Sequence, residues 1–230
     1  MLPDFLIIGA MKSGTTSLYR YLLSHPDISR PTTKEPEFFS KNYIKGFDWY
    51  KSLFSGKGYN FEASTGYTKR QRWPDVAERI FHDLPTVKLI YSVRDPVERA
   101  VSHYQHNVRK GREKLPFSRA IRKPGSHYIA TSRYAFQLEA YYQFYQAGRV
   151  HVIDFEELKS DPVSCMNDLC EFIGVAPRYD KNTLDTVYNR ADTNALEVSK
   201  EDLDYLKAQL RTDVESLRAM TAIGFRKWCL

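Results

Sequence analysis

A short segment near the start of the chain combines glycine, lysine and hydroxyl residues at a spacing that suits an anion. Lys12 lies between Gly9 and Gly14. Four hydroxyl residues stand around the second glycine: Ser13, Thr15, Thr16 and Ser17. The N–H groups of a glycine turn, an ammonium and hydroxyl groups are the donors that hold a phosphate or a sulfate. The segment therefore predicts a binding site for such a group.

The residues on either side predict the elements that position this loop. Residues 5–8 are apolar and mostly branched, which indicates a buried strand. Leu18, Tyr21 and Leu22 recur at helical spacing. The loop is thus expected to join a strand to the N-terminus of a helix, where the helix dipole favours a negative charge.

The loop departs from the usual phosphate loop, G-x-x-x-x-G-K-[ST]. Both glycines match, but Thr15 stands where the lysine belongs, and the lysine comes at position 12. A P-loop kinase would also need a magnesium-binding acid after a strand, which Asp154 could imitate. The displaced lysine argues against a kinase, which stays as the alternative enzyme class.

A second segment offers donors for another anion. Residues 86–93 predict a buried strand, and Asp95 and Pro96 are residue types that open a helix. Arg94 leaves the strand just before this helix, and Ser102 lies on it. A guanidinium and a hydroxyl are expected donors for a phosphate dianion.

Together the two segments resemble the sulfotransferases that use 3′-phosphoadenosine 5′-phosphosulfate (PAPS), and the resemblance covers residues 5 to about 175. It implies that the first loop binds the 5′-phosphosulfate through Lys12, Ser13, Gly14, Thr15, Thr16 and Ser17. It also implies that Arg94 and Ser102 hold the 3′-phosphate. Family members often cover the adenosine with a C-terminal segment that carries a basic residue, and Arg190 is the candidate here.

The resemblance also implies residues on the acceptor side. Lys34 lies in a Lys-Glu-x-x-Phe-Phe segment and is expected to touch the sulfuryl group or the acceptor. Glu62 lies in a segment that resembles the one holding the family's general base, although Ala63 replaces the family's lysine. Since ligands bind at the carboxyl ends of parallel strands, Glu62 is expected at the rim beside the loop. His106, one helical turn after the serine, is a second acceptor-side candidate and the competing base.

Alternating strands and helices predict a three-layer α/β fold with a central, mainly parallel sheet, in a single domain over residues 1–230. Ser132 is expected to cap a helix over residues 133–147, and Ser199 a last long helix. The helix after Asp95 is expected to bury one apolar face and to carry a polar stripe beside it. The apolar face is Val97, Val101, Tyr104 and Val108, and the polar stripe is Arg99, Ser102 and His106.

Composition limits the classes of protein. The chain has 230 residues, of which 42% are hydrophobic and 27% charged, as in globular rather than disordered proteins. The net charge of +6 suits an anionic ligand, but no basic run or known motif points to nucleic acid. The three cysteines show neither disulfide nor metal-ligand spacing, and no signal peptide or long apolar run is present. The sequence therefore predicts a cytoplasmic protein without a membrane span or a metal.

The predicted function is in-line transfer of a sulfuryl group from PAPS to a hydroxyl or amine of a carbohydrate or a small metabolite. Lys12 would stabilise the leaving phosphate and Glu62 would take the acceptor's proton. The non-enzymatic alternative is a nucleotide- or polyanion-binding protein that uses the same basic cleft.

Overall fold

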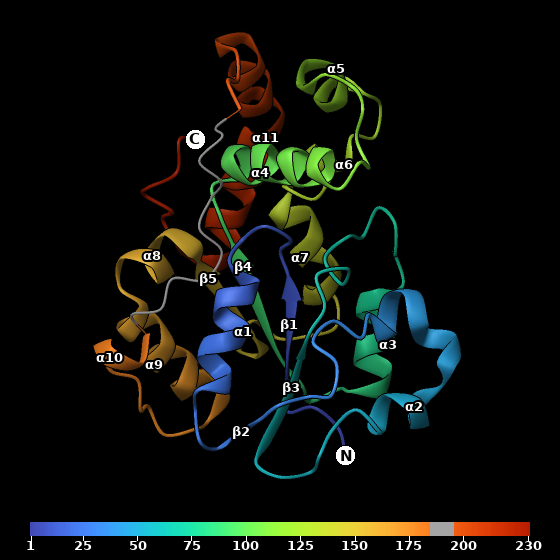
Figure 1. The fold of residues 1–230 in the computed structure, drawn as a ribbon, viewed down its shortest axis with the longest axis vertical. Coiled ribbons are helices and arrows are strands. Elements are labelled where there is room, and N and C mark those ends of the chain that lie inside the picture. Colours follow the sequence, from blue (N-terminus) through green and yellow to red (C-terminus); the bar gives the residue numbers. More distant parts are fainter. Residues whose placement is uncertain (185–195) are drawn as a thin grey trace.

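The computed structural model describes residues 1–184 and 196–230 of the chain. Five parallel strands form a central sheet in the order β2–β3–β1–β4–β5 (Figure 1). In chain order the strands are β1 (Phe5–Gly9), β2 (Ile28–Ser29), β3 (Tyr59–Ala63), β4 (Lys88–Val93) and β5 (Val150–Asp154). The predicted α/β class with a mainly parallel sheet is confirmed, and β2 is a short edge strand that the sequence patterns did not reveal.

Helices cover both faces of the sheet, so the fold has three layers (Figure 1). The α-helices are α1 (Thr15–Leu23), α2 (Phe47–Lys51), α3 (Val76–Asp83), α4 (Pro96–Arg109), α5 (Phe117–Arg122), α6 (His127–Ala130), α7 (Tyr134–Tyr142), α8 (Phe155–Ser160), α9 (Pro162–Ile173), α10 (Lys181–Leu184) and α11 (Lys200–Thr221). Shorter helical turns are η1 (Phe38–Asn42), η2 (Tyr43–Lys45) and η3 (Ala147–Arg149). Side chains alternate across β1, because Phe5 and Ile7 pack with α1 and α9 while Leu6 and Ile8 pack with α3, α7 and α11.

Helix α4 lies across the end of the sheet toward which β1 points (Figure 1). Asp95 caps it as predicted, since its carboxylate accepts hydrogen bonds from the N–H groups of Val97 (2.9 Å) and Glu98 (3.0 Å). The expected apolar face is wrong at its far end, where Val108 is exposed. There the helix runs beyond the elements that bury its earlier turns.

Two later helices test the predicted caps. Ser199 caps α11, because its hydroxyl accepts a hydrogen bond from the N–H of Asp202 at 3.1 Å. Ser132 does not cap α7, which begins one residue later than expected and ends at Tyr142. The hydroxyl of Ser132 instead accepts a hydrogen bond from Arg99 (2.6 Å) and donates one to the carbonyl of Pro96 (2.8 Å). Ser132 therefore bonds to residues that are distant in sequence instead of capping α7.

Candidate functional site

The predicted anion loop joins β1 to α1, as expected. Gly14 precedes the first residue of α1 with φ of 79°, a conformation that glycine adopts without strain. A Cβ atom at this position would lie 2.3 Å from the ring of Phe155, which begins α8. The glycine therefore serves both the turn and the close approach of this ring.

Basic side chains from the loop and from the segment after β4 gather at one place. Burial, followed by the positive charges of Arg109 and Arg94, lowers the pKa of Lys12. Burial, followed by the charges of Lys12 and Arg109, lowers the pKa of His106. Like charges repel one another, so a bound anion among these groups would be favoured. Lys12 thus interacts electrostatically with both Arg94 and His106.

Arg109 was missed in the sequence although its spacing could have revealed it. It follows His106 by three residues on α4, so it extends the same side of the helix. Ser102 is half-buried on α4, and Arg190 lies outside the described residues.

Arg94 is held in place by neighbours on two elements. Its guanidinium donates to the Glu98 carboxylate at 2.6 and 3.2 Å and lies 5.5 Å from the ring centre of Phe155. Glu156 of α8 lies 3.9 Å away, close enough for a further ion pair. Since Phe155 also packs against Gly14, one ring contacts both predicted anion sites.

Lys34 reaches the loop from the segment after β2. Its Nζ donates to the Thr16 hydroxyl at 2.9 Å and lies 3.6 Å from the carboxylate of Glu35. Lys34 thus lies beside the loop, and its contact with the sulfuryl group or the acceptor stays a prediction. Ser13 and Thr15, by contrast, are buried, and the N–H of Ser13 bonds to the carbonyl of Ala10 at 3.1 Å. Their hydroxyl groups are therefore not exposed beside the loop.

Glu62 is less accessible than its expected place at the rim implied. It is near the end of β3, as predicted, but its carboxylate is wholly buried. The carboxylate accepts hydrogen bonds from the hydroxyl groups of Tyr50 (3.1 Å), Tyr67 (2.6 Å) and Ser64 (2.6 Å). Burial raises its pKa to about 7, and these three hydrogen bonds act in the opposite direction. Glu62 is enclosed because the aromatic residues after β2 and β3 close over it.

Arg99 also lies elsewhere than predicted. It is wholly buried instead of sharing the half-buried stripe of Ser102 and His106. Its guanidinium donates to the hydroxyl of Ser132, to the carbonyl of Met11 at 3.4 Å and to the carbonyl of Tyr128. Arg99 therefore ties the loop to the segment between α6 and α7.

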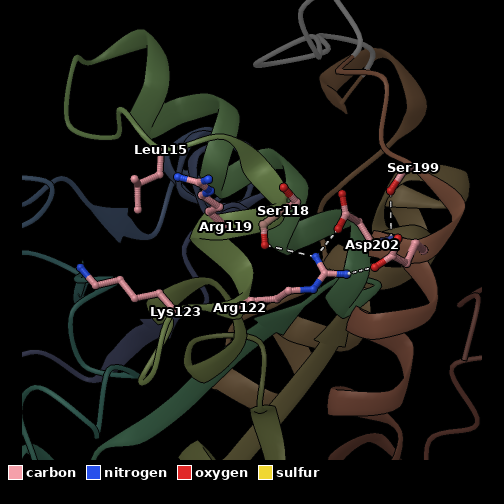
Figure 2. Close-up of a pocket in the computed structure, with 8 residues that line it drawn as sticks. Leu115, Ser118, Arg119, Arg122, Lys123, Ser199 and Asp202 are labelled. Carbon is pink, nitrogen blue, oxygen red and sulfur yellow. Dashed lines mark hydrogen bonds and ion pairs between the residues drawn. The ribbon is translucent and has the colours of Figure 1, made fainter.

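One hollow in the described part of the chain is lined by residues other than these. Its volume is about 880 Å³, and it opens between α5 and the start of α11 (Figure 2). Arg122 bridges its walls through ion pairs with Asp202 and with Glu201, the latter at 3.1 Å. None of the predicted site residues lines it, so the candidate site rests on the loop and its cations.

Residues 1–184 and 196–230 contain neither a candidate membrane-spanning helix nor a candidate metal site. No helix there is long and apolar enough to cross a membrane. No three histidine, cysteine, aspartate or glutamate side chains there gather in an arrangement that could hold a metal ion.

A parallel sheet with an anion loop and converging cations defines an α/β protein built to bind a phosphorylated or sulfated ligand. The chain belongs to the sulfotransferase domain family, whose model matches residues 2–228. A sulfotransferase structure from Alicyclobacillus acidocaldarius is 33% identical, with a TM-score of 0.82 over 99% of each chain.

Curated relatives belong to a narrower group. The human bifunctional heparan sulfate N-deacetylase/N-sulfotransferase 3 is 32% identical over 205 residues, which cover 77% of this chain. The mouse bifunctional heparan sulfate N-deacetylase/N-sulfotransferase 4 is 31% identical over the same length. The match covers 23% of each relative, so this chain spans about a quarter of their length.

Proposed function

We propose that this sulfotransferase moves a sulfuryl group from PAPS to an amine or hydroxyl on a carbohydrate. The observation that carries the donor assignment is the Phe155 ring, which packs against Gly14 of the loop and lies 5.5 Å from the Arg94 guanidinium, so the two anion sites adjoin. The charges of Arg94 and Arg109 also act on Lys12. Among the described residues no carboxylate pairs with Lys12, so a bound anion would supply its counter-charge. PAPS has anionic groups at both ends of its ribose and so suits two adjacent anion sites.

The two anion sites would divide the donor between them. The N–H groups of the loop, Thr16 and Ser17 would hold the 5′ end, and Lys12 would face the bridging oxygen. Arg94, preorganised by Glu98, would hold the 3′-phosphate together with Ser102. Arg190 would contribute from outside the described residues.

In the reaction, a lone pair of the acceptor forms a bond to sulfur while the bond from sulfur to the 5′-phosphate oxygen breaks. The electron pair goes to that oxygen, and adenosine 3′,5′-bisphosphate leaves. Lys12 would stabilise the charge on the leaving oxygen, so it acts mainly in the transition state. The acceptor's proton passes to a carboxylate of the protein.

We assign that carboxylate to Glu35 in place of the predicted Glu62. Glu35 is exposed, and Lys34 lies between it and the hydroxyl of Thr16 on the loop. Glu62 is wholly buried and its oxygens already accept three hydrogen bonds. In this arrangement Glu62 would act indirectly, through the residues that it holds in place. His106, whose pKa is lowered, would be neutral at physiological pH.

Two observations bear on the acceptor and on the alternative enzyme. The mouse and human relatives are heparan sulfate N-deacetylase/N-sulfotransferases, which supports a sugar amine as acceptor. Asp154, the acid that a kinase would use for magnesium, accepts hydrogen bonds from the N–H of Glu156 (3.0 Å) and the indole of Trp228 (3.1 Å). It thus already serves as the cap of α8, which argues against a kinase.

Calorimetry tests the donor assignment. Adenosine 3′,5′-bisphosphate should bind at least about tenfold more tightly than 5′-AMP, because only the former reaches Arg94 and Ser102. Arg94→Ala should remove most of this difference while 5′-AMP binding changes little. Equal affinities of the wild-type protein for the two nucleotides would overturn the assignment.

A further inference from the structure

One lysine beside the loop has no role in the reaction as described above. Lys69 lies in the turn that follows β3 and is half-buried. In the described structure its Nζ has one hydrogen-bond partner, the sulfur of Met11 at 3.6 Å. An ammonium carries three N–H groups, and a thioether is a weak acceptor, so Lys69 lacks strong partners.

The backbone of this turn is fixed on both sides. Lys69 donates its N–H to Gly66 (3.2 Å), and its carbonyl accepts from the N–H groups of Arg72 (2.8 Å) and Trp73 (2.9 Å). The hydroxyl of Thr68 donates to the carbonyl of Ile8 on β1 at 3.1 Å. Lys69 is therefore held against the end of β1.

The charges around Lys69 do not neutralise it. Burial lowers its pKa, while the carboxylates of Glu37 and Glu35 act in the opposite direction. Neither forms an ion pair with it, and no other acid does so within the described ranges. The Glu37 carboxylate already accepts from Ser40 at 2.6 Å and from the N–H of Gly66 at 3.0 Å. A half-buried cation without a counter-ion favours a bound anion.

We propose that Lys69 binds an oxyanion on the acceptor side of the transfer site. The oxyanion is either a sulfuryl oxygen or an acidic group of the acceptor, and the inference rests on the proposed sulfotransfer. Lys69 contacts Met11, which directly precedes Lys12, and its charge interacts with Glu35, the proposed base. Ala63 stands where the resembled segment carries a lysine, and Lys69 supplies an ammonium group a few residues later.

The test compares Lys69→Met, which keeps the side chain's length, with Lys69→Arg and with the control Lys57→Met at an exposed lysine. One acceptor is an oligosaccharide of alternating glucosamine and glucuronic acid, and the other is the same chain with its carboxyl groups reduced. Lys69→Met should lower kcat/KM at least about tenfold while Lys69→Arg keeps most of it. A loss with both acceptors identifies the sulfuryl oxygen, and a loss with the acidic chain alone identifies the acceptor's carboxylate.

Other outcomes overturn the proposal. Retention of kcat/KM within about twofold by Lys69→Met on both acceptors, as for a surface substitution, contradicts the proposal. A parallel loss of melting temperature and of adenosine 3′,5′-bisphosphate affinity would give Lys69 a structural role instead.

If the wild-type protein sulfates neither chain, the proposed acceptor class fails, and binding still tests Lys69. Inorganic sulfate and each oligosaccharide are titrated into the complex with adenosine 3′,5′-bisphosphate. Weaker binding of any of the three probes by Lys69→Met supports the proposal, and unchanged binding of all three overturns it.

Discussion

At the scale of single residues, the two candidate bases differ in what their carboxylates contact. Glu62 lies within a set of hydroxyl groups and has no exposed surface. Glu35 is exposed and pairs with Lys34, which touches the loop. A general base must come within hydrogen-bond reach of the proton it removes, so access separates the two residues better than acidity does.

Replacing each carboxylate by an amide tests this difference. Glu35→Gln should lower kcat by roughly 10²-fold or more, because the amide cannot accept the proton. Glu62→Gln should lower it far less, since that residue acts through its neighbours. Turnover with one acceptor is measured alongside binding of adenosine 3′,5′-bisphosphate, which both variants should keep. If Glu62→Gln loses its rate and Glu35→Gln retains it, the assignment of the base to Glu35 is wrong.

The raised pKa of Glu62 has a consequence for stability. Its pKa is about 7 in the folded protein and 4.5 ordinarily, so between these values the native state holds more protons than the unfolded state. The free energy of unfolding should therefore fall as the pH rises through this window. Glu62→Gln has no proton to lose at this position. Between pH 5 and pH 8 the free energy of unfolding of the wild-type protein should therefore fall by roughly 2 kcal/mol relative to that of the variant. Urea unfolding at several pH values measures this difference, and parallel pH profiles would contradict it.

At the scale of elements, the loop before α1 and the start of α8 meet at one contact. Gly14 leaves room for the ring of Phe155, and the same ring supports Arg94. The two anion sites, which are far apart in sequence, thus share a wall. A change on one side of this wall is expected to reach the other.

Gly14→Ala tests the shared wall. The added Cβ would displace Phe155, so binding of adenosine 3′,5′-bisphosphate should weaken by at least about tenfold. Gly125→Ala is the matched control, since Gly125 also has a positive φ (68°) but no atom within 4 Å of an added Cβ. Both variants should lose some stability through backbone strain, of the order of 1 kcal/mol. Calorimetry and thermal unfolding separate the two effects, and equal affinities of the two variants would argue against the shared wall.

Helix α4 shows what local patterns could and could not predict. Its start followed from Asp95 and Pro96, because a cap acts within a few residues. The burial of Arg99 did not follow, since its partners Ser132 and Tyr128 come about 30 residues later. The burial of Glu62 did not follow either, since one of its partners, Tyr50, belongs to the segment between β2 and β3.

At the scale of the whole molecule, the sheet could be predicted from the sequence, but its edge strand β2 could not. Strands β1 and β4 contain apolar runs, and in β3 and β5 apolar residues alternate with polar ones, whereas β2 has two residues and leaves no pattern. The convergence of Lys12 with Arg94 and His106 could be expected from the resemblance, because parallel strands end at one edge. Treating residues 1–230 as a single domain stays a prediction, and the family match over residues 2–228 accords with it.

The burial of Arg99 bears on how ionic strength affects this protein. The net charge of +6 is carried mostly by surface side chains, whose attraction for anions dissolved salt screens within about 10 Å at 0.1 M. Arg99 is wholly buried, and its described hydrogen-bond partners Ser132, Met11, Tyr128 and His103 contribute neutral groups, since burial lowers the pKa of His103. Its charge acts on the loop through the protein interior, where mobile ions do not enter. The loop should therefore keep part of its attraction for anions in concentrated salt, after long-range steering by the surface has been lost.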